Sequence, residues 1–190
     1  MDVSESVSVT AAVSVTLPRL RAYLHAPAAR AAGWTPGQWA GLPGADPGEL
    51  PAAVAEADRW LDGDAATVLR ELARNDELTL RYDEATGSLA AGVAARADFR
   101  LPALVWAVTV FRGLAAFMAG DDQGLVTVSA DWSDDSVLLH LTPGHAALLD
   151  RGRDARAIAE ARSRAIGIEA TAQDAGDDPA GDVIDRLLDR

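Results

Sequence analysis

One apolar stretch near the middle of the chain constrains the fold more than any other feature. Within 104–118 only three residues are not apolar, namely Thr109, Arg112 and Gly113. Pro102 is suited to the first turn of a helix, so we predict a helix over 102–119. The stretch is shorter than the roughly 20 residues that span a membrane, and it contains Arg112. A helix apolar on nearly all sides must be covered all round, so we expect it to lie between a sheet and either other helices or another subunit.

Alternating apolar and polar residues on both sides of this helix predict two β-hairpins. The alternating segments are 78–82 and 89–95 before the helix, and 126–132 and 137–141 after it. Turn-forming residues separate the two members of each pair, at 84–88 and at 133–136. Pro143 and Gly144 are expected to end the sheet. The two hairpins therefore predict an antiparallel sheet with one face against the central helix.

The N-terminal half supplies one further strand and several helices. Apart from Glu5 and Ala12, residues 3–17 alternate between apolar residues and Ser or Thr, which predicts a long strand that breaks near Ala11-Ala12 or projects beyond the sheet. Helices are expected to begin at Pro18, to span 51–61 and to span 65–74. The fold class is therefore α+β, with a mainly antiparallel sheet (two hairpins around a central buried helix), N- and C-terminal helices and an N-terminal strand.

The chain is expected to form one domain over 1–168, followed by an acidic flexible tail over 169–190. The tail ends in a short amphipathic helix. Its apolar residues fall on one helical face, and we predict that this stripe binds a partner: Val183, Ile184, Leu187 and Leu188. So short a helix is marginal alone in water, so it should be ordered only when docked on its own domain or on another protein.

Within the domain, the loop 33–51 is rich in Pro and Gly and holds Trp34 and Trp39. Two tryptophans in such a loop either seal the edge of a core or stack on a planar ligand, and we favour the seal. The C-terminal helix of the domain is expected over 154–166.

Composition excludes several classes of function. There is no cysteine and no lysine, which excludes disulfides, thiolate metal sites and lysine chemistry. The net charge of −12 disfavours nucleic acids as partners, because binding to phosphate requires a concentrated basic surface. The N-terminus lacks the basic, apolar pattern of a secretory signal. We expect a cytoplasmic protein, with the Arg-only, Ala-rich composition of a GC-rich bacterial genome, and no cofactor.

One polar cluster could serve catalysis or metal binding. It is made of residues around the second hairpin: Asp131, Asp134, Asp135, His140 and His145. The two histidines are five positions apart, which is not the spacing at which neighbouring helical turns share a metal. No Gly-x-Ser-x-Gly motif or phosphate-binding glycine loop accompanies them. The cluster supports only an alternative function, that of a small hydrolase or ligand-binding enzyme.

The favoured function is a non-enzymatic protein-binding, adaptor or assembly protein, either chaperone-like or a structural subunit, that associates with itself. The apolar central helix, the long N-terminal strand and the amphipathic tail all favour it, because each offers a surface to another chain. The order helix, hairpin, helix, hairpin, helix resembles bacterial type III secretion chaperones and related small acidic α+β folds at the level of fold alone, and a fold does not determine a function.

Overall fold

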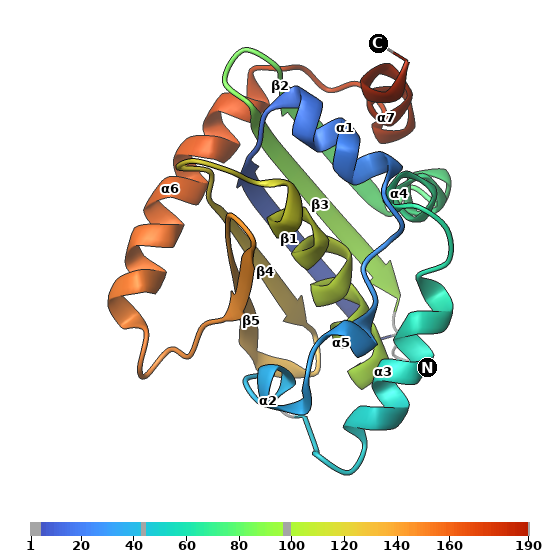
Figure 1. Ribbon diagram of the computed structural model, residues 1–190, viewed down its shortest axis with the longest axis vertical. Coiled ribbons are helices and arrows are strands. Elements are labelled where there is room, and N and C mark those ends of the chain that lie inside the picture. The colour runs from blue at the N-terminus through green and yellow to red at the C-terminus, as the bar shows by residue number, and fades with distance from the viewer. Residues whose placement is uncertain (1–4, 43–44, 97–99, 190) are drawn as a thin grey trace.

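The computed structural model describes residues 5–42, 45–96 and 100–189, and places helices on both faces of a six-stranded sheet (Figure 1). The strands are β1 (Ser6–Ser14), β2 (Leu78–Asp83), β3 (Ser88–Arg96), β4 (Gly124–Ala130), β5 (Ser133–Thr142) and β6 (His145–Leu148). The helices are α1 (Leu17–His25), α2 (Pro36–Trp39), α3 (Leu50–Trp60), α4 (Ala65–Arg74), α5 (Arg100–Arg112), α6 (Ala155–Gln173) and α7 (Ala180–Leu188). Every strand pairing in the described residues is antiparallel, and the predicted α+β class is confirmed.

Strand β1 lies in the middle of the sheet, whose order is β2-β3-β1-β4-β5-β6. It joins the two predicted hairpins, because Val9 pairs with Val93 of β3 on one side and with Val128 of β4 on the other. The strand continues through Ala11 and Ala12, where we expected a break, and both side chains are buried. A strand covered on both faces needs small or apolar residues at successive positions, which explains why the alternation stops there.

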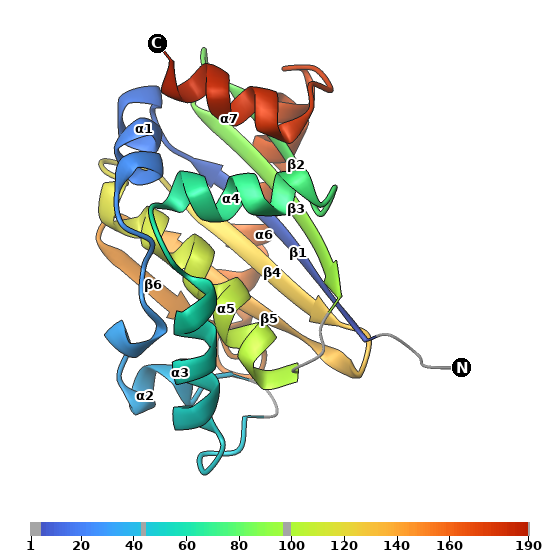
Figure 2. The ribbon, with the colours of Figure 1, turned by 90° about the vertical axis from the view of Figure 1, so that its right-hand side faces the viewer.

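The central helix α5 is buried between the sheet and α3, as Figure 2 shows. It begins at Arg100, earlier than predicted, and gives way after Arg112 to the 3₁₀ turn η2 (Gly113–Phe117). A Cβ at Gly113 would lie 3.2 Å from the Cβ of Ala29, so glycine allows the segment after α1 to approach closely. The span Arg100–Phe117 is the only described helical segment long and apolar enough to cross a membrane, and just over half of it is buried in the fold.

The second face of the sheet is covered by α6, which the sequence did not place there. This face carries a second apolar cluster, in which Leu125 and Leu138 pack under Ile158 and Ala161. The helix runs to Gln173 instead of ending at Ile166, so the boundary we expected at 168/169 falls inside α6.

The C-terminal helix α7 is docked on its own domain, against α4, β2 and α1. Val183, Ile184 and Leu187 are buried there and Leu188 is partly buried. Arg21 Nε donates a hydrogen bond to the Leu187 carbonyl over 2.6 Å, and Arg70 binds Asp185. The expected flexible tail is therefore reduced to the short connection between α6 and α7, and docking on the chain itself is the alternative that the structure shows.

Capping and turn residues explain where several helices and strands begin and end. Asp64 accepts a hydrogen bond from the Thr67 amide over 2.7 Å and begins α4 as predicted. Gly87, with a φ of +68°, closes the β2–β3 turn, where a Cβ would lie 2.9 Å from the Val15 carbonyl oxygen. The prediction that Pro143 and Gly144 end the sheet is wrong. They form a tight turn into β6, and Gly144 takes the positive φ that the turn needs.

Candidate functional site

A broad groove opens where α3, the start of α5 and the β4–β5 turn meet. Its volume is about 1020 Å³, which is at the upper end of the range typical of ligand pockets. The floor is apolar and includes Ala53, Leu104 and Val137, all buried. We call it the acidic groove, because the charged residues along it are Glu5, Glu49, Glu56, Asp135 and Arg100.

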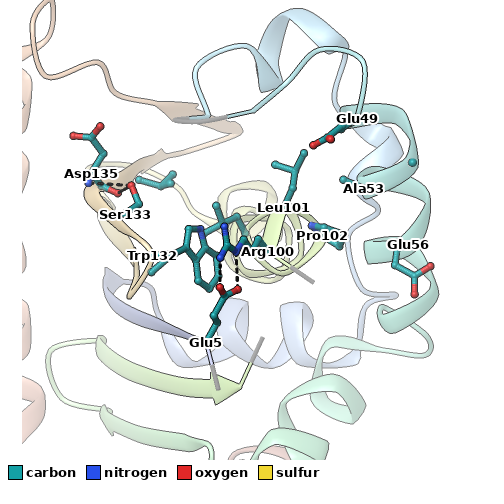
Figure 3. Close-up of a pocket in the computed structure, with 14 residues that line it drawn as sticks. Glu5, Glu49, Ala53, Glu56, Arg100, Leu101, Pro102, Trp132, Ser133 and Asp135 are labelled. Carbon is teal, nitrogen blue, oxygen red and sulfur yellow. Dashed lines mark hydrogen bonds and ion pairs between the residues drawn. The ribbon is translucent and has the colours of Figure 1, made fainter. Parts of the chain in front are cut away.

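The one arginine of the groove is already occupied. Arg100 Nε donates to Glu5 Oε2 over 2.6 Å, and a second guanidinium nitrogen bonds the other carboxylate oxygen. The guanidinium carbon also lies 5.7 Å from the centre of the Trp132 ring, and Figure 3 shows these three side chains grouped beside the groove. The hydrogen bond from Arg100 lowers the pKa of Glu5 below its usual value. Glu5 therefore stays ionised and Arg100 is not available to neutralise other acids.

Two further acidic residues line the groove, and their carboxylates have no partner among the described residues. Within the described residues, no hydrogen bond or ion pair is made by the side chain of Glu49, at the start of α3, or by the carboxylate of Asp135. Figure 3 shows them on opposite sides of the opening. Glu56 is bound to Arg59, but this pair is exposed and such pairs contribute little. The groove therefore carries uncompensated negative charge above an apolar floor.

The residues that line the groove do not include a serine paired with a histidine. Its single hydroxyl, that of Ser133, accepts a hydrogen bond from the Asp135 amide over 3.2 Å, and no histidine lines it. A nucleophile needs an adjacent base and donors for the developing charge. The groove therefore has no hydroxyl nucleophile with an adjacent histidine base.

The polar cluster expected from the sequence is not assembled. Asp134 and Asp135 lie at the beginning of β5, and His140 lies five residues further along, about 17 Å away on an extended strand. Asp131 is engaged locally, because its carboxylate accepts hydrogen bonds from the amide and hydroxyl of Ser6, at 2.8 and 3.1 Å. Within the described part of the chain, no group of three or more His, Asp or Glu residues could hold a metal.

His140 and His145 are near each other but have different surroundings. His140 is half-buried beneath α6, and His145 is exposed at the start of β6. Burial lowers the pKa of His140, and the nearby His145 and Arg164 lower it further. These surroundings disfavour the protonated form of the His140 imidazole.

The two tryptophans of loop 33–51 seal the core, as favoured. Trp39 is 1% exposed and Trp34 9%, and their rings meet edge to face at 4.8 Å. The Trp39 indole donates to the Ala31 carbonyl over 3.2 Å.

The chain matches no protein-family model, no curated protein and no solved structure. The geometry of the chain is therefore the basis for assigning a function.

Sequence reasoning missed most of the acidic groove. Glu5 and Arg100 lie in segments far from Glu49 and Glu56, which are the N-cap and a residue of α3, and Asp135 was noted only as part of the polar cluster. Trp132 was expected to face the core, and it is partly buried at the groove. The one usable signal was acidic residues next to segments that were predicted to pack together.

Proposed function

We propose that this protein is a non-enzymatic, cytoplasmic adaptor or assembly protein that binds a segment of another protein in the acidic groove. The segment carries an apolar side chain flanked by Arg or Lys. The observation that supports this most directly is the pair of unpartnered carboxylates, Glu49 and Asp135, on opposite sides of an apolar floor. An apolar anchor would bury itself on the floor while basic neighbours meet the acids.

Charge supports a basic partner in a second way. The chain carries a net charge of −12, and an acidic cleft with low-dielectric walls attracts cations and raises their rate of association. A basic segment would therefore be steered toward the groove before any apolar contact forms. Binding of this kind weakens as salt increases, because exposed charges are screened.

The alternative of a small hydrolase has less support. It requires His140 or His145 to work with Asp131, Asp134 or Asp135, and the strand β5 holds these groups apart. No other observation in the described residues favours it.

Self-association remains a prediction, but its original arguments no longer apply. Strand β1 is paired on both sides, and α5 is covered by α3 of the same chain. Any association between copies must use other surfaces.

The first test uses two variants of exposed alanines on α3. Ala52 lines the acidic groove, whereas Ala55, on the same helix, does not. The probe is a labelled peptide of about 14 residues with Leu at i, i+3, i+4 and i+7 and Arg elsewhere, the spacing of helix-in-groove anchors. We expect the wild-type chain to bind it and Ala52→Arg to weaken binding at least about tenfold, because the new side chain fills the groove and repels the peptide. Fluorescence anisotropy gives the affinities.

Ala55→Arg is the control, since it makes the same change of charge and size on the same helix. It should bind within about twofold of the wild type. A Leu/Glu peptide with the same apolar stripe should not bind. The proposal fails if Ala52→Arg and Ala55→Arg bind the Leu/Arg peptide equally well, because binding would then reflect overall charge alone.

A further inference from the structure

A second groove lies on the other side of the first turns of α5. It has a volume of about 530 Å³ and an apolar lining supplied by five elements, β1, β3, α3, α4 and α5. The apolar residues that line it are Val7, Trp60, Val68, Leu72, Ala95, Ala103 and Trp106. We call it the tryptophan groove, after Trp60 and Trp106. Trp60 is one of two large apolar side chains that the described chain leaves exposed, at 38%.

The rim of the tryptophan groove has the same charge as the acidic groove. The charged residues of this rim are one arginine, Arg96, and three acids: Asp62, Glu71 and Glu77. Glu71 forms an exposed pair with Arg74 at 3.2 Å, which screens it only weakly. The carboxylates of Asp62 and Glu77 have no partner among the described residues. Indole faces beside carboxylates attract guanidinium and ammonium groups through both ring and charge.

The two grooves share their dividing wall. Leu101 and Leu104 of α5 face the acidic groove, whereas Ala103 and Trp106 of the same helix face the tryptophan groove. Helix α3 also contributes to both, through Glu56 on one side and Trp60 on the other. Because a helix with its side chains is about 10–12 Å across, the two apolar floors are separated by roughly that distance.

We infer that one partner protein occupies both grooves at once, with two apolar anchors, each flanked by Arg or Lys, on either side of the start of α5. This inference rests on the proposed function and identifies its partner as a two-anchor ligand. The occupant follows from charge complementarity, since both rims are acidic and both floors are apolar. Linking two weak anchors makes the second contact intramolecular, so the pair binds far more tightly than either anchor alone.

The test compares the single Leu/Arg peptide with a tandem of two copies joined by about eight Gly and Ser residues. Such a linker spans roughly 16 Å on average, enough to cross the wall between the grooves. We expect the tandem to bind the wild-type chain about 10- to 100-fold more tightly than the single peptide. A gain of no more than about twofold, the statistical advantage of two copies, would overturn the inference.

Variants in the tryptophan groove identify where the second anchor binds. Glu71→Arg reverses a rim charge on α4, and Glu160→Arg is its matched control, because Glu160 is likewise exposed and paired with a neighbouring arginine, Arg156 at 3.0 Å. Glu71→Arg should abolish the gain from the tandem while leaving binding of the single peptide within about twofold, and Glu160→Arg should retain the gain. Trp60→Ser, which changes no charge, should also abolish the gain in affinity that the tandem peptide has over the single peptide. Persistence of the gain in both tryptophan-groove variants would contradict the inference.

The outcomes separate the two proposals. If Ala52→Arg abolishes single-peptide binding but the tryptophan-groove variants have no effect, the proposed function stands and the two-anchor partner fails. If neither peptide binds, both fail. Light scattering of the chain without peptide completes the test. A wild-type dimer that Glu71→Arg dissociates would show that a second copy of the chain occupies the tryptophan groove, which also overturns the inference.

Discussion

Arg112 is held at the end of α5 by three groups of different chemistry. One of its guanidinium nitrogens donates to the Arg30 carbonyl, the guanidinium carbon lies 4.9 Å from the centre of the Trp34 ring, and Asp58 is close enough to favour its charge. Burial lowers its pKa and leaves Nε without a hydrogen-bond partner in the described part of the structure. A charge in so apolar a stretch needs a partner, and a carbonyl and an indole from the loop after α1 supply it here.

A double-mutant cycle measures this contact. We expect Arg112→Met and Trp34→Leu each to destabilise the chain, with a coupling free energy of about 0.5–2 kcal/mol between them, because a partly desolvated cation lies over the ring. Urea unfolding gives the four stabilities. Arg59→Met in the same Trp34→Leu background is the control, since Arg59 is exposed and pairs with Glu56 on the same helix. Strictly additive effects of Arg112→Met and Trp34→Leu would contradict the assignment.

The helices and strands differ in how well their own sequences predict them. The two hairpins and α5 could be predicted, because each has a strong period and clear turn residues. Strand β6 has only four residues, which is too short to show the two-residue alternation of a strand in the sequence. It is recognised as a strand only from its pairing with β5. The central place of β1 could not be predicted, since periodicity shows that a strand buries one face but not which strands pair with it. The acidic groove was missed for the same reason, because Glu5 meets Arg100 only through the pairing of the sheet.

Helix α7 depends on its docking more than on its own propensity. It has nine residues, and an isolated helix of that length is marginal in water. Ile184 is fully buried at its centre. We expect Ile184→Ala to cost about 2–4 kcal/mol of unfolding free energy, because it leaves a cavity beneath the helix. The exposed Asp189, replaced by Ala, should change it by less than about 0.5 kcal/mol.

Urea denaturation and hydrogen exchange together test this expectation. Exchange should increase first in the amides of α7 in Ile184→Ala, since local opening of a docked helix precedes global unfolding. If both substitutions have equally small effects, α7 is not stabilised by its buried face.

At the scale of the whole molecule, one strand joins two otherwise separate halves. β2 and β3 form one hairpin and β4 to β6 form a second antiparallel unit, and β1 alone is hydrogen-bonded to both. Helix α7 packs against α4, β2 and α1, so the segment after α6 contacts the half of the sheet that contains β2. Deleting the N-terminal strand should therefore divide the sheet, not merely shorten it.

We expect a chain that lacks residues 1–16 to lose cooperative thermal unfolding, and a synthetic peptide of residues 1–16 to restore it when added. The peptide would supply both rows of hydrogen bonds and the buried valines of β1. Circular dichroism and near-ultraviolet spectra monitor the recovery. A peptide with Val9 and Val13 replaced by Asp is the control and should have no effect, because charges would enter the core. Cooperative unfolding of the truncated chain on its own would contradict this role.

The position of β1 also sets the order in which the protein can fold as it is made. β1 leaves the ribosome before the other strands of the sheet, and its neighbour β4 begins about 110 residues later. At about 5–20 residues per second, translation takes roughly 5–20 seconds to cover that distance. During this interval a Val-rich strand has one or both of its edges unpaired, and such edges invite aggregation. The nascent chain therefore needs its strand β1 to be kept from aggregating until β4 has been synthesised.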